Sequence, residues 1–228
     1  MWLGKEKKMK EKRILTKHEE TREMTILAMF IAIIAVLGLV PNGFGGTIGF
    51  IKIAPNLEAT IIHIPVLIGA ALLGRKFGIY LGLAFGVVSN IAAFIYASPL
   101  FIYPWVAVLP RFVFGLIIYD LTHIFVRLFK NKFLGLGISF FILTFLHTVM
   151  VLTMMLTSYT MVFEYDSISA AFVPYITILV ALNVPFAAFV EMLLAAIIGS
   201  ILVVRLSQYL KRDEYLSESE SVEVEVGN

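Results

Sequence analysis

MTILAMFIAIIAVLGLV, residues Met24–Val40, is an uncharged and almost entirely apolar run. Similar apolar stretches recur along the chain as far as Val204, separated by short polar breaks. Hydrophobic residues make up 60% of the 228 residues and charged residues only 15%, whereas a soluble domain has ~25% charged residues. The pattern predicts an integral membrane protein. A soluble enzyme or a nucleic-acid-binding protein would need polar faces that these segments lack.

Hydropathy divides the rest of the chain into further candidate spans. The six spans that we predict are Met24–Pro41, Ala59–Leu73, Phe77–Ile95, Val106–Phe129, Phe133–Leu156 and Ala171–Leu206. Only a helix satisfies its backbone hydrogen bonds within one segment in lipid. The fold class that we predict is therefore an all-α membrane protein with six transmembrane helices.

The distribution of the basic residues predicts how the chain is oriented in the membrane and on which side its two terminal segments lie. Eight of the eighteen Lys and Arg residues lie in residues 1–22, and a six-helix arrangement places sixteen of them on one side. The positive-inside rule makes that side cytoplasmic. We therefore expect a basic cytoplasmic segment at 1–22, a membrane domain at 23–206 and an acidic, disordered cytoplasmic tail at 207–228. Both termini of this multi-pass protein of the cell membrane are then cytoplasmic.

The loop between the first two spans is rich in glycine and also apolar. It begins with Asn42 and contains Gly43, Phe44, Gly45 and Gly46. Glycine gives the backbone freedom to fold back, and a merely solvated linker would not carry so much apolar surface. We interpret these four residues as part of an extracellular lid over the helix bundle. A loop that lies against lipid headgroups is the alternative.

Small residues mark two helix faces. Gly78, Gly82 and Gly86 recur every four residues, and such spacing lets a neighbouring backbone approach closely. In the first span, Ala28 and Ala32 form a second small face. That face serves either internal packing or the docking of another membrane subunit.

Polar residues inside the spans are few, and each is costly unless it is paired or faces a cavity. Most of them map to the outer half of the predicted bundle, as a pocket open to the outside would require. The candidate substrate-binding residues are Arg111, Asn183, His147, Thr148, Asn90 and His63, with Trp105 and Tyr103 at the mouth. The two aromatic residues fit an interfacial belt equally well.

Motifs of other function classes are missing from the sequence. There is no HExxH helix, Walker A loop or GxSxG elbow, cysteine is absent, and four dispersed histidines form no metal-ligand pattern. An intramembrane enzyme using Glu191 and His147 would lack any motif. A scaffold without a ligand would not need polar residues gathered beneath a glycine-rich loop.

Four segments resemble the substrate-specific S component of energy-coupling factor (ECF) vitamin transporters. They are AMFIA at Ala28–Ala32, IHIPVLIGAALLGRKFG at Ile62–Gly78, LPRFVFG at Leu109–Gly115, and Asn183 followed by Glu191. The resemblance implies six helices and a vitamin site near the outer surface, closed by the loop after helix one. It also implies docking of a membrane T component on Ala28 and Ala32. Two cytoplasmic ATPases would use ATP and Mg, and this chain itself would hold no cofactor or metal.

The second and third segments are most similar to pantothenate S components. One departure concerns helix five, where His147-Thr148 stands in place of an expected Asn-Thr pair. Pantothenate is a small carboxylate with hydroxyls and an amide, and a guanidinium such as that of Arg111 pairs well with a carboxylate. Folate, riboflavin or a pyrimidine precursor remain open as substrates.

Overall fold

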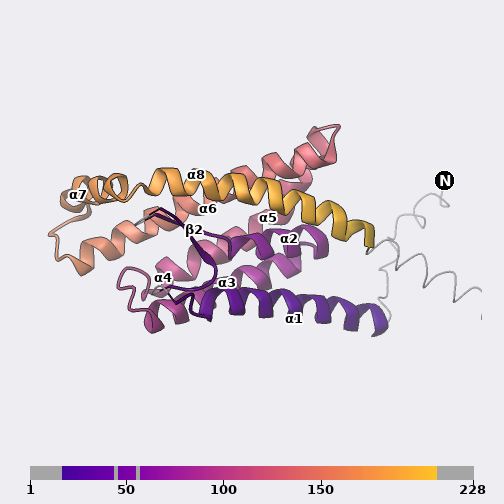
Figure 1. The fold of residues 1–228 in the computed structure, drawn as a ribbon, viewed down its shortest axis with the longest axis horizontal. Helices are drawn as coiled ribbons and strands as arrows, with labels where there is room; N and C mark the ends of the chain where they lie inside the picture. The colour runs from indigo at the N-terminus through magenta and orange to yellow at the C-terminus, as the bar shows by residue number, and fades with distance from the viewer. Residues whose placement is uncertain (1–16, 44–45, 55–56, 210–228) are drawn as a thin grey trace, which may run out of the picture.

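The computed structural model describes residues 17–43, 46–54 and 57–209 (Figure 1). The two lid residues Phe44 and Gly45, most of the predicted basic segment, and almost all of the predicted tail lie outside the described residues. In chain order, the helices are α1 (Lys17–Leu39), α2 (His63–Leu73), α3 (Arg75–Ile95), α4 (Pro104–Ala107), α5 (Leu109–Leu128), α6 (Lys132–Val162), α7 (Ile168–Ala181) and α8 (Val184–Leu194). A π-helical turn at Ala195–Gly199 follows, and the helix then continues to Tyr209.

Five helical segments are long and apolar enough to cross a membrane, so the described chain is that of a multi-pass membrane protein. They are Glu20–Leu39, Arg75–Ile95, Pro104–Leu128, Lys132–Val162 and Val184–Tyr209. The helices α2 and α7 are apolar but shorter. The prediction of a helical membrane protein is confirmed by these segments. In Figure 1, the start of α1 and the end of the α8 segment lie at one end of the bundle, and α7 lies at the other.

The predicted sixth span at 171–206 is divided in the structure. Asn183 adopts a left-handed backbone conformation, with φ 53° and ψ 29°, and ends α7 before α8 begins. Pro185 lies two positions after Asn183, and proline has no N–H with which to continue a helix from α7. The preceding helix α6 has 31 residues and extends beyond the predicted end at Leu156. The α6–α7 turn therefore lies beyond the end that the sequence predicts for the fifth span.

The segment between α1 and α2 forms two short antiparallel strands, β1 (Phe50–Ala54) and β2 (Leu57–Thr60). The helix α2 consequently begins at His63 rather than at the predicted Ala59, because Ala59 pairs with Ile51 in this hairpin. The loop also bonds to the bundle, since the Gly49 N–H donates to the Leu37 carbonyl at 2.9 Å. The folding-back that the glycine-rich sequence predicts is thus present in its backbone.

Helices α3 and α5 pack with their backbones in contact. A β-carbon built on Gly82 would lie 2.5 Å from the Arg111 carbonyl oxygen and 2.8 Å from the Gly115 α-carbon. One on Gly86 would lie 2.8 Å from the Val108 α-carbon. The predicted close approach along the glycine face is confirmed, and its partner is α5.

The buried core surrounds this helix pair. Phe85, Phe114 and Phe140 are among its largest fully buried side chains, together with Leu67 and Leu81. The faces turned away from the core carry exposed apolar residues, for example Phe172 and Val173 on α7. Such a surface suits a protein surrounded by lipid, where burial of apolar side chains is not required.

At one end of the bundle, Asp120 of α5 forms an ion pair with Arg75, with 3.2 Å between the nitrogen and the oxygen. Both side chains are about half exposed, so this contact contributes little to stability. His123 stacks on Tyr119, with 5.6 Å between the ring centroids. These contacts agree with a structural role for Asp120 and His123.

We expect Gly82→Ala to lower the free energy of unfolding by about 1–3 kcal/mol, because the added methyl group meets backbone atoms that cannot move aside. The matched control is Gly137→Ala in α6, where the nearest heavy atom to the new β-carbon is 3.7 Å away. That change should be neutral or stabilising. Denaturant unfolding in detergent, followed by circular dichroism, measures both variants. Equal stability of the two would show that α3 and α5 are not locked by backbone contact.

Candidate binding cavity

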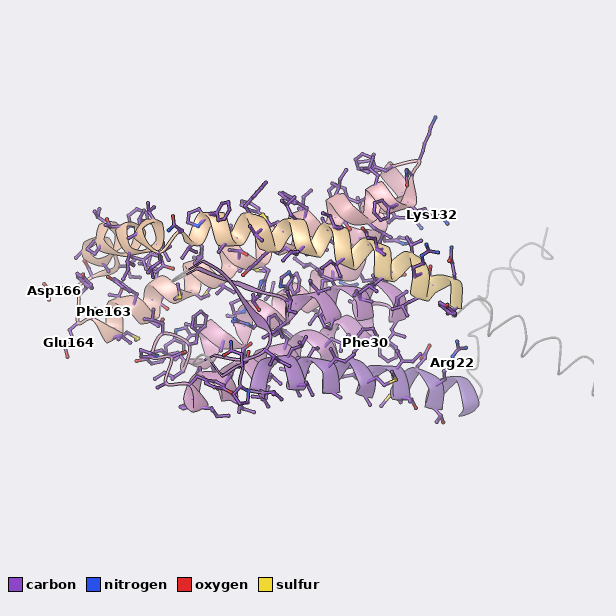
Figure 2. All side chains as sticks on the ribbon, viewed as in Figure 1. Arg22, Phe30, Lys132, Phe163, Glu164 and Asp166 are labelled. Atoms are coloured by element: carbon purple, nitrogen blue, oxygen red, sulfur yellow. The ribbon has the colours of Figure 1, made fainter. Side chains whose placement is uncertain are left out.

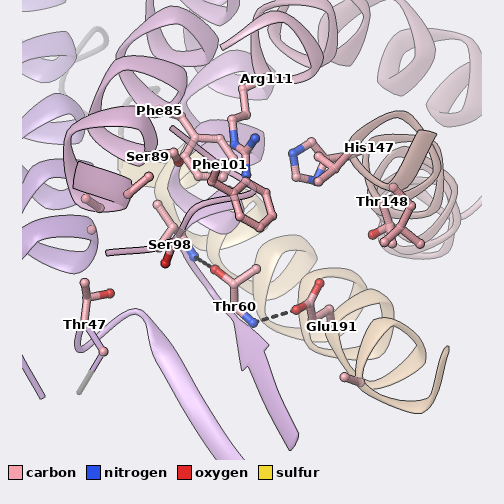
Figure 3. Close-up of a pocket in the computed structure, with 18 of the residues that line it drawn as sticks. Thr47, Thr60, Phe85, Ser89, Ser98, Phe101, Arg111, His147, Thr148 and Glu191 are labelled. Atoms are coloured by element: carbon pink, nitrogen blue, oxygen red, sulfur yellow. Dashed lines mark hydrogen bonds between the residues drawn. The ribbon is translucent and has the colours of Figure 1, made fainter. Parts of the chain in front are cut away.

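A cavity of about 460 Å³ lies between α1, α3, α5, α6, α8 and the loop before α2. This volume falls in the range of about 300–1,000 Å³ that is common for small-molecule sites. Its polar lining residues are Thr47, Thr60, Ser89, Tyr96, Ser98, Arg111, His147, Thr148 and Glu191. Figure 3 shows most of these side chains around the cavity.

Arg111 lies at the start of α5 and is 92% buried, with a relative exposure of only 8%. Its Nη1 atom donates to the carbonyl oxygens of Val106 and Ala107, both at 2.9 Å. The residue four positions after Val106 is Pro110, which has no N–H to offer that carbonyl. The guanidinium therefore supplies the hydrogen bond that the helix start lacks.

The rest of the Arg111 guanidinium is held by aromatic rings. Its central carbon lies 5.2 Å from the ring centroid of Phe85 and 5.6 Å from that of Phe101, which is cation–π distance. Among the described residues, no acidic side chain forms an ion pair with Arg111. Arg111 is thus a buried cation beside a cavity without an anionic partner. This burial does not fit a guanidinium that reaches out to the membrane surface.

His147 of α6 lines the same cavity next to Arg111 (Figure 3). Its ring centroid lies 4.8 Å from that of Phe114 and 6.2 Å from that of His63. His63 is fully buried and lies outside the cavity lining, and neither of its ring nitrogens has a hydrogen-bond partner among the described residues. The structure therefore brings Arg111, His147 and Thr148 together and places His63 behind them.

Glu191 of α8 connects the cavity wall to the loop. One carboxylate oxygen, Oε1, accepts a hydrogen bond from the backbone N–H of Thr60 at 2.7 Å (Figure 3). Thr60 and Thr47 both line the cavity, and Thr47 is only 1% exposed. The loop after α1 therefore forms part of the cavity wall and does not stand apart from the bundle.

Other predicted site residues lie beside the cavity and do not line it. Asn90 donates to the carbonyl oxygens of Phe101 and Ile102, at 3.2 and 2.9 Å, and so fixes the segment that carries Phe101. The ring of Tyr103 contacts that of Trp105 in a tilted arrangement, with 4.7 Å between the ring centroids, and the Trp105 indole donates to Thr157. Those two aromatic residues agree better with the belt than with the mouth of the site.

Asn183 and the lid glycines have backbone roles in the structure. Asn183 forms the left-handed turn between Leu182 and Val184, which do line the cavity, while its own side chain is exposed. Among the four predicted lid residues, Gly46 lines the cavity, and Gly43 occupies a turn with φ 78°. The identity of a polar residue in a span therefore does not show whether that residue forms a turn, as Asn183 does, or contacts a ligand.

Several lining residues are absent from the sequence-based candidates. Thr60, Ser89 and Ser98 are ordinary small polar residues, and only the fold of the loops brings them to the cavity. Glu191 is different, because a lone acidic residue in an apolar helix is a strong signal of function. Among the described residues, no group of three or more His, Asp or Glu side chains could hold a metal ion.

On the first helix, Ala28 and Ala32 are exposed, whereas Leu27 and Ile34 are buried. The two alanines therefore lie on the face of α1 that is turned away from the core. Of the two interpretations of this small-residue face, internal packing does not fit the described structure.

A helical membrane bundle with a partly open cavity, lined in part by the folded loop after α1, is an arrangement suited to holding a small molecule. The family model for the ECF transporter substrate-specific component matches residues 22–204, and the chain belongs to this family. Its members are non-catalytic transporter subunits. The chain is also similar to the pantothenic acid transporter PanT of Lactococcus lactis subsp. cremoris (strain MG1363). It is 33% identical to that protein over 155 residues, which cover 60% of this chain and 74% of PanT.

Proposed function

We propose that this chain is the S component of an ECF importer for pantothenate, which it captures from outside the cell. The observation that carries the substrate is Arg111, a buried guanidinium without an acidic partner at the cavity wall. A ligand carboxylate would supply the missing negative charge, and pantothenate has one carboxylate. The similarity to PanT supports the same substrate. Folate, riboflavin or a pyrimidine precursor is the alternative within the family.

Arg111 can offer a ligand only some of the N–H donors of its guanidinium group. Nη1 already serves two backbone carbonyls, and Nε is buried without a partner. The Nη2 atom is left for the ligand carboxylate, with His147 and Thr148 on the neighbouring wall. The hydroxyls and the amide of pantothenate then find acceptors and donors among Ser89, Ser98 and Thr60.

The six-helix arrangement follows if α7 stays at the outer end. The crossings are then α1, α2 with the hairpin before it, α3, α4–α5, α6 and the α8 segment. Figure 2 shows Arg22 and Lys132 at one end of the bundle, and Glu164 and Asp166 at the other. The basic end is cytoplasmic by the positive-inside rule. The segments 1–22 and 207–228 then flank the membrane domain on the cytoplasmic side, and the loop after α1 acts as the extracellular lid.

The partners that we propose are a membrane T component and two cytoplasmic ATPases, which hydrolyse ATP with Mg. The exposed alanines of α1 are the proposed docking face for the T component. Alanine side chains let a second helix approach closely, and the larger exposed residues Met29 and Ile33 flank them.

Topology is tested by cysteine labelling, since the chain has no native cysteine. A cysteine at Ser219 should react with a membrane-impermeant maleimide only after the cells are permeabilised. The control is Glu164→Cys in the α6–α7 turn, which should be labelled in intact cells. Labelling of the Ser219 variant in intact cells would contradict a cytoplasmic C-terminus.

Replacing Ala28 and Ala32 together by Phe should abolish uptake and association with the T component, because the side chains fill the space for the partner helix. Substrate binding by the isolated subunit should be retained. Val173→Phe, at an exposed position of α7, is the control and should leave uptake unchanged. A double variant that also loses binding would indicate that these alanines support the subunit itself.

Arg111→Ala should weaken pantothenate binding by roughly 10- to 150-fold, since a hydrogen bond to a charged group contributes about 1.5–3 kcal/mol. Arg111→Lys keeps the charge but loses the geometry that serves two carbonyls, so its loss should be smaller though measurable. Arg75→Ala, in the surface ion pair with Asp120, should bind as the native protein does.

Isothermal titration of the purified variants measures these affinities. Unchanged affinity in Arg111→Ala would remove Arg111 from the site. No pantothenate binding by the native protein would rule out the substrate while leaving the family assignment intact.

A further inference from the structure

We propose that Glu191 forms a second subsite in the cavity, which accepts a hydroxyl or amide donor and excludes ligands with a second negative charge. The inference rests on the proposed function, because it concerns the opposite end of the same ligand. It goes further in making Glu191 the residue that selects the free vitamin over its phosphorylated form.

A hydrogen bond orients the carboxylate of Glu191, and only one of the two carboxylate oxygens takes part in it. Its Oε1 atom accepts the 2.7 Å hydrogen bond from the Thr60 N–H, and this bond fixes the side chain against the loop. The other carboxylate oxygen accepts no hydrogen bond from the described residues. Because Glu191 lines the cavity, that oxygen is available to a ligand donor.

The cavity therefore has one basic and one acidic side chain that form no ion pair with each other. Arg111 comes from α5 and Glu191 from α8, and neither forms an ion pair within the described part of the chain. Figure 3 shows them on different sides of the cavity, with His147 on the Arg111 side. A complementary ligand has one anionic end and one neutral end that donates hydrogen bonds.

Pantothenate has this distribution of groups. Its carboxylate pairs with Arg111, and the primary hydroxyl at its other end donates to the free oxygen of Glu191. Phosphorylation of that hydroxyl removes the donor and brings a negatively charged phosphate against the carboxylate. Like charges placed together in a binding site suppress the wrong partner. Arg111 and Glu191 together thus admit free pantothenate and reject its 4′-phosphate ester.

The test compares pantothenate with 4′-phosphopantothenate on native protein and on Glu191→Gln. Glutamine can still accept from the Thr60 N–H through its amide oxygen, so the loop contact is kept while the charge is removed. A matched control is Glu164→Gln, which changes an acidic residue in the exposed α6–α7 turn (Figure 2). Affinities are measured by isothermal titration on purified protein in detergent, and thermal unfolding of each variant verifies its folding.

The expected result is that native protein and Glu164→Gln prefer pantothenate over the phosphate ester by about 100-fold or more, and that Glu191→Gln reduces this preference by about tenfold or more. Pantothenate affinity itself should fall only severalfold in Glu191→Gln. An unchanged preference in a folded Glu191→Gln variant that binds pantothenate overturns the Glu191 inference alone. Absence of pantothenate binding to the native protein overturns the inference together with the substrate assignment.

If Glu191→Gln loses all binding while remaining folded, the charge would be required for the ligand itself, and the exclusion role would also be wrong. Glu191→Ala separates the loop contact from the charge, because alanine removes both. A preference that changes in Glu191→Ala but not in Glu191→Gln would assign the effect to the loop and overturn the proposal.

Discussion

The backbones of α3 and α5 touch, and the position of Arg111 depends on that contact. Gly82 can approach the Arg111 carbonyl only because it has no side chain. This approach brings Phe85, one turn further along α3, over the guanidinium. The charge itself is held by a carbonyl oxygen that Pro110 leaves without a backbone donor. Packing between two apolar helices thus determines where a buried cation is held, and the cavity forms beside it.

The sequence predicts the helices well where one physical signal dominates. The uncharged runs locate the long spans, and the four-residue glycine period predicts a close helix contact, although not that α5 is the partner. The signal fails at Asn183, where local backbone chemistry ends a helix inside a continuous apolar run. It also fails at α2, because the pairing of Ala59 with Ile51 depends on how the loop folds.

The candidate site was predictable to the extent that a residue was conspicuous in its own segment. Arg111 and His147 are unusual in apolar helices, and the structure places both at the cavity. Asn90 and Asn183 are equally unusual, yet they serve a loop and a turn, which shows that a polar side chain in a span has backbone uses as well. Thr60 and Ser98 carry no sequence signal, since only tertiary folding brings them to the cavity.

The length of α6 has a consequence for the surrounding lipid. A helix of 31 residues is about 46 Å long, whereas the hydrocarbon layer is only ~30 Å thick. The excess requires either a tilt of the helix or protrusion of its last turns together with α7, whose exposed Phe172 and Val173 are still apolar. Both responses to hydrophobic mismatch deform the neighbouring bilayer at a modest energetic cost. The thickness of the host membrane therefore affects how far this subunit tilts or protrudes from it.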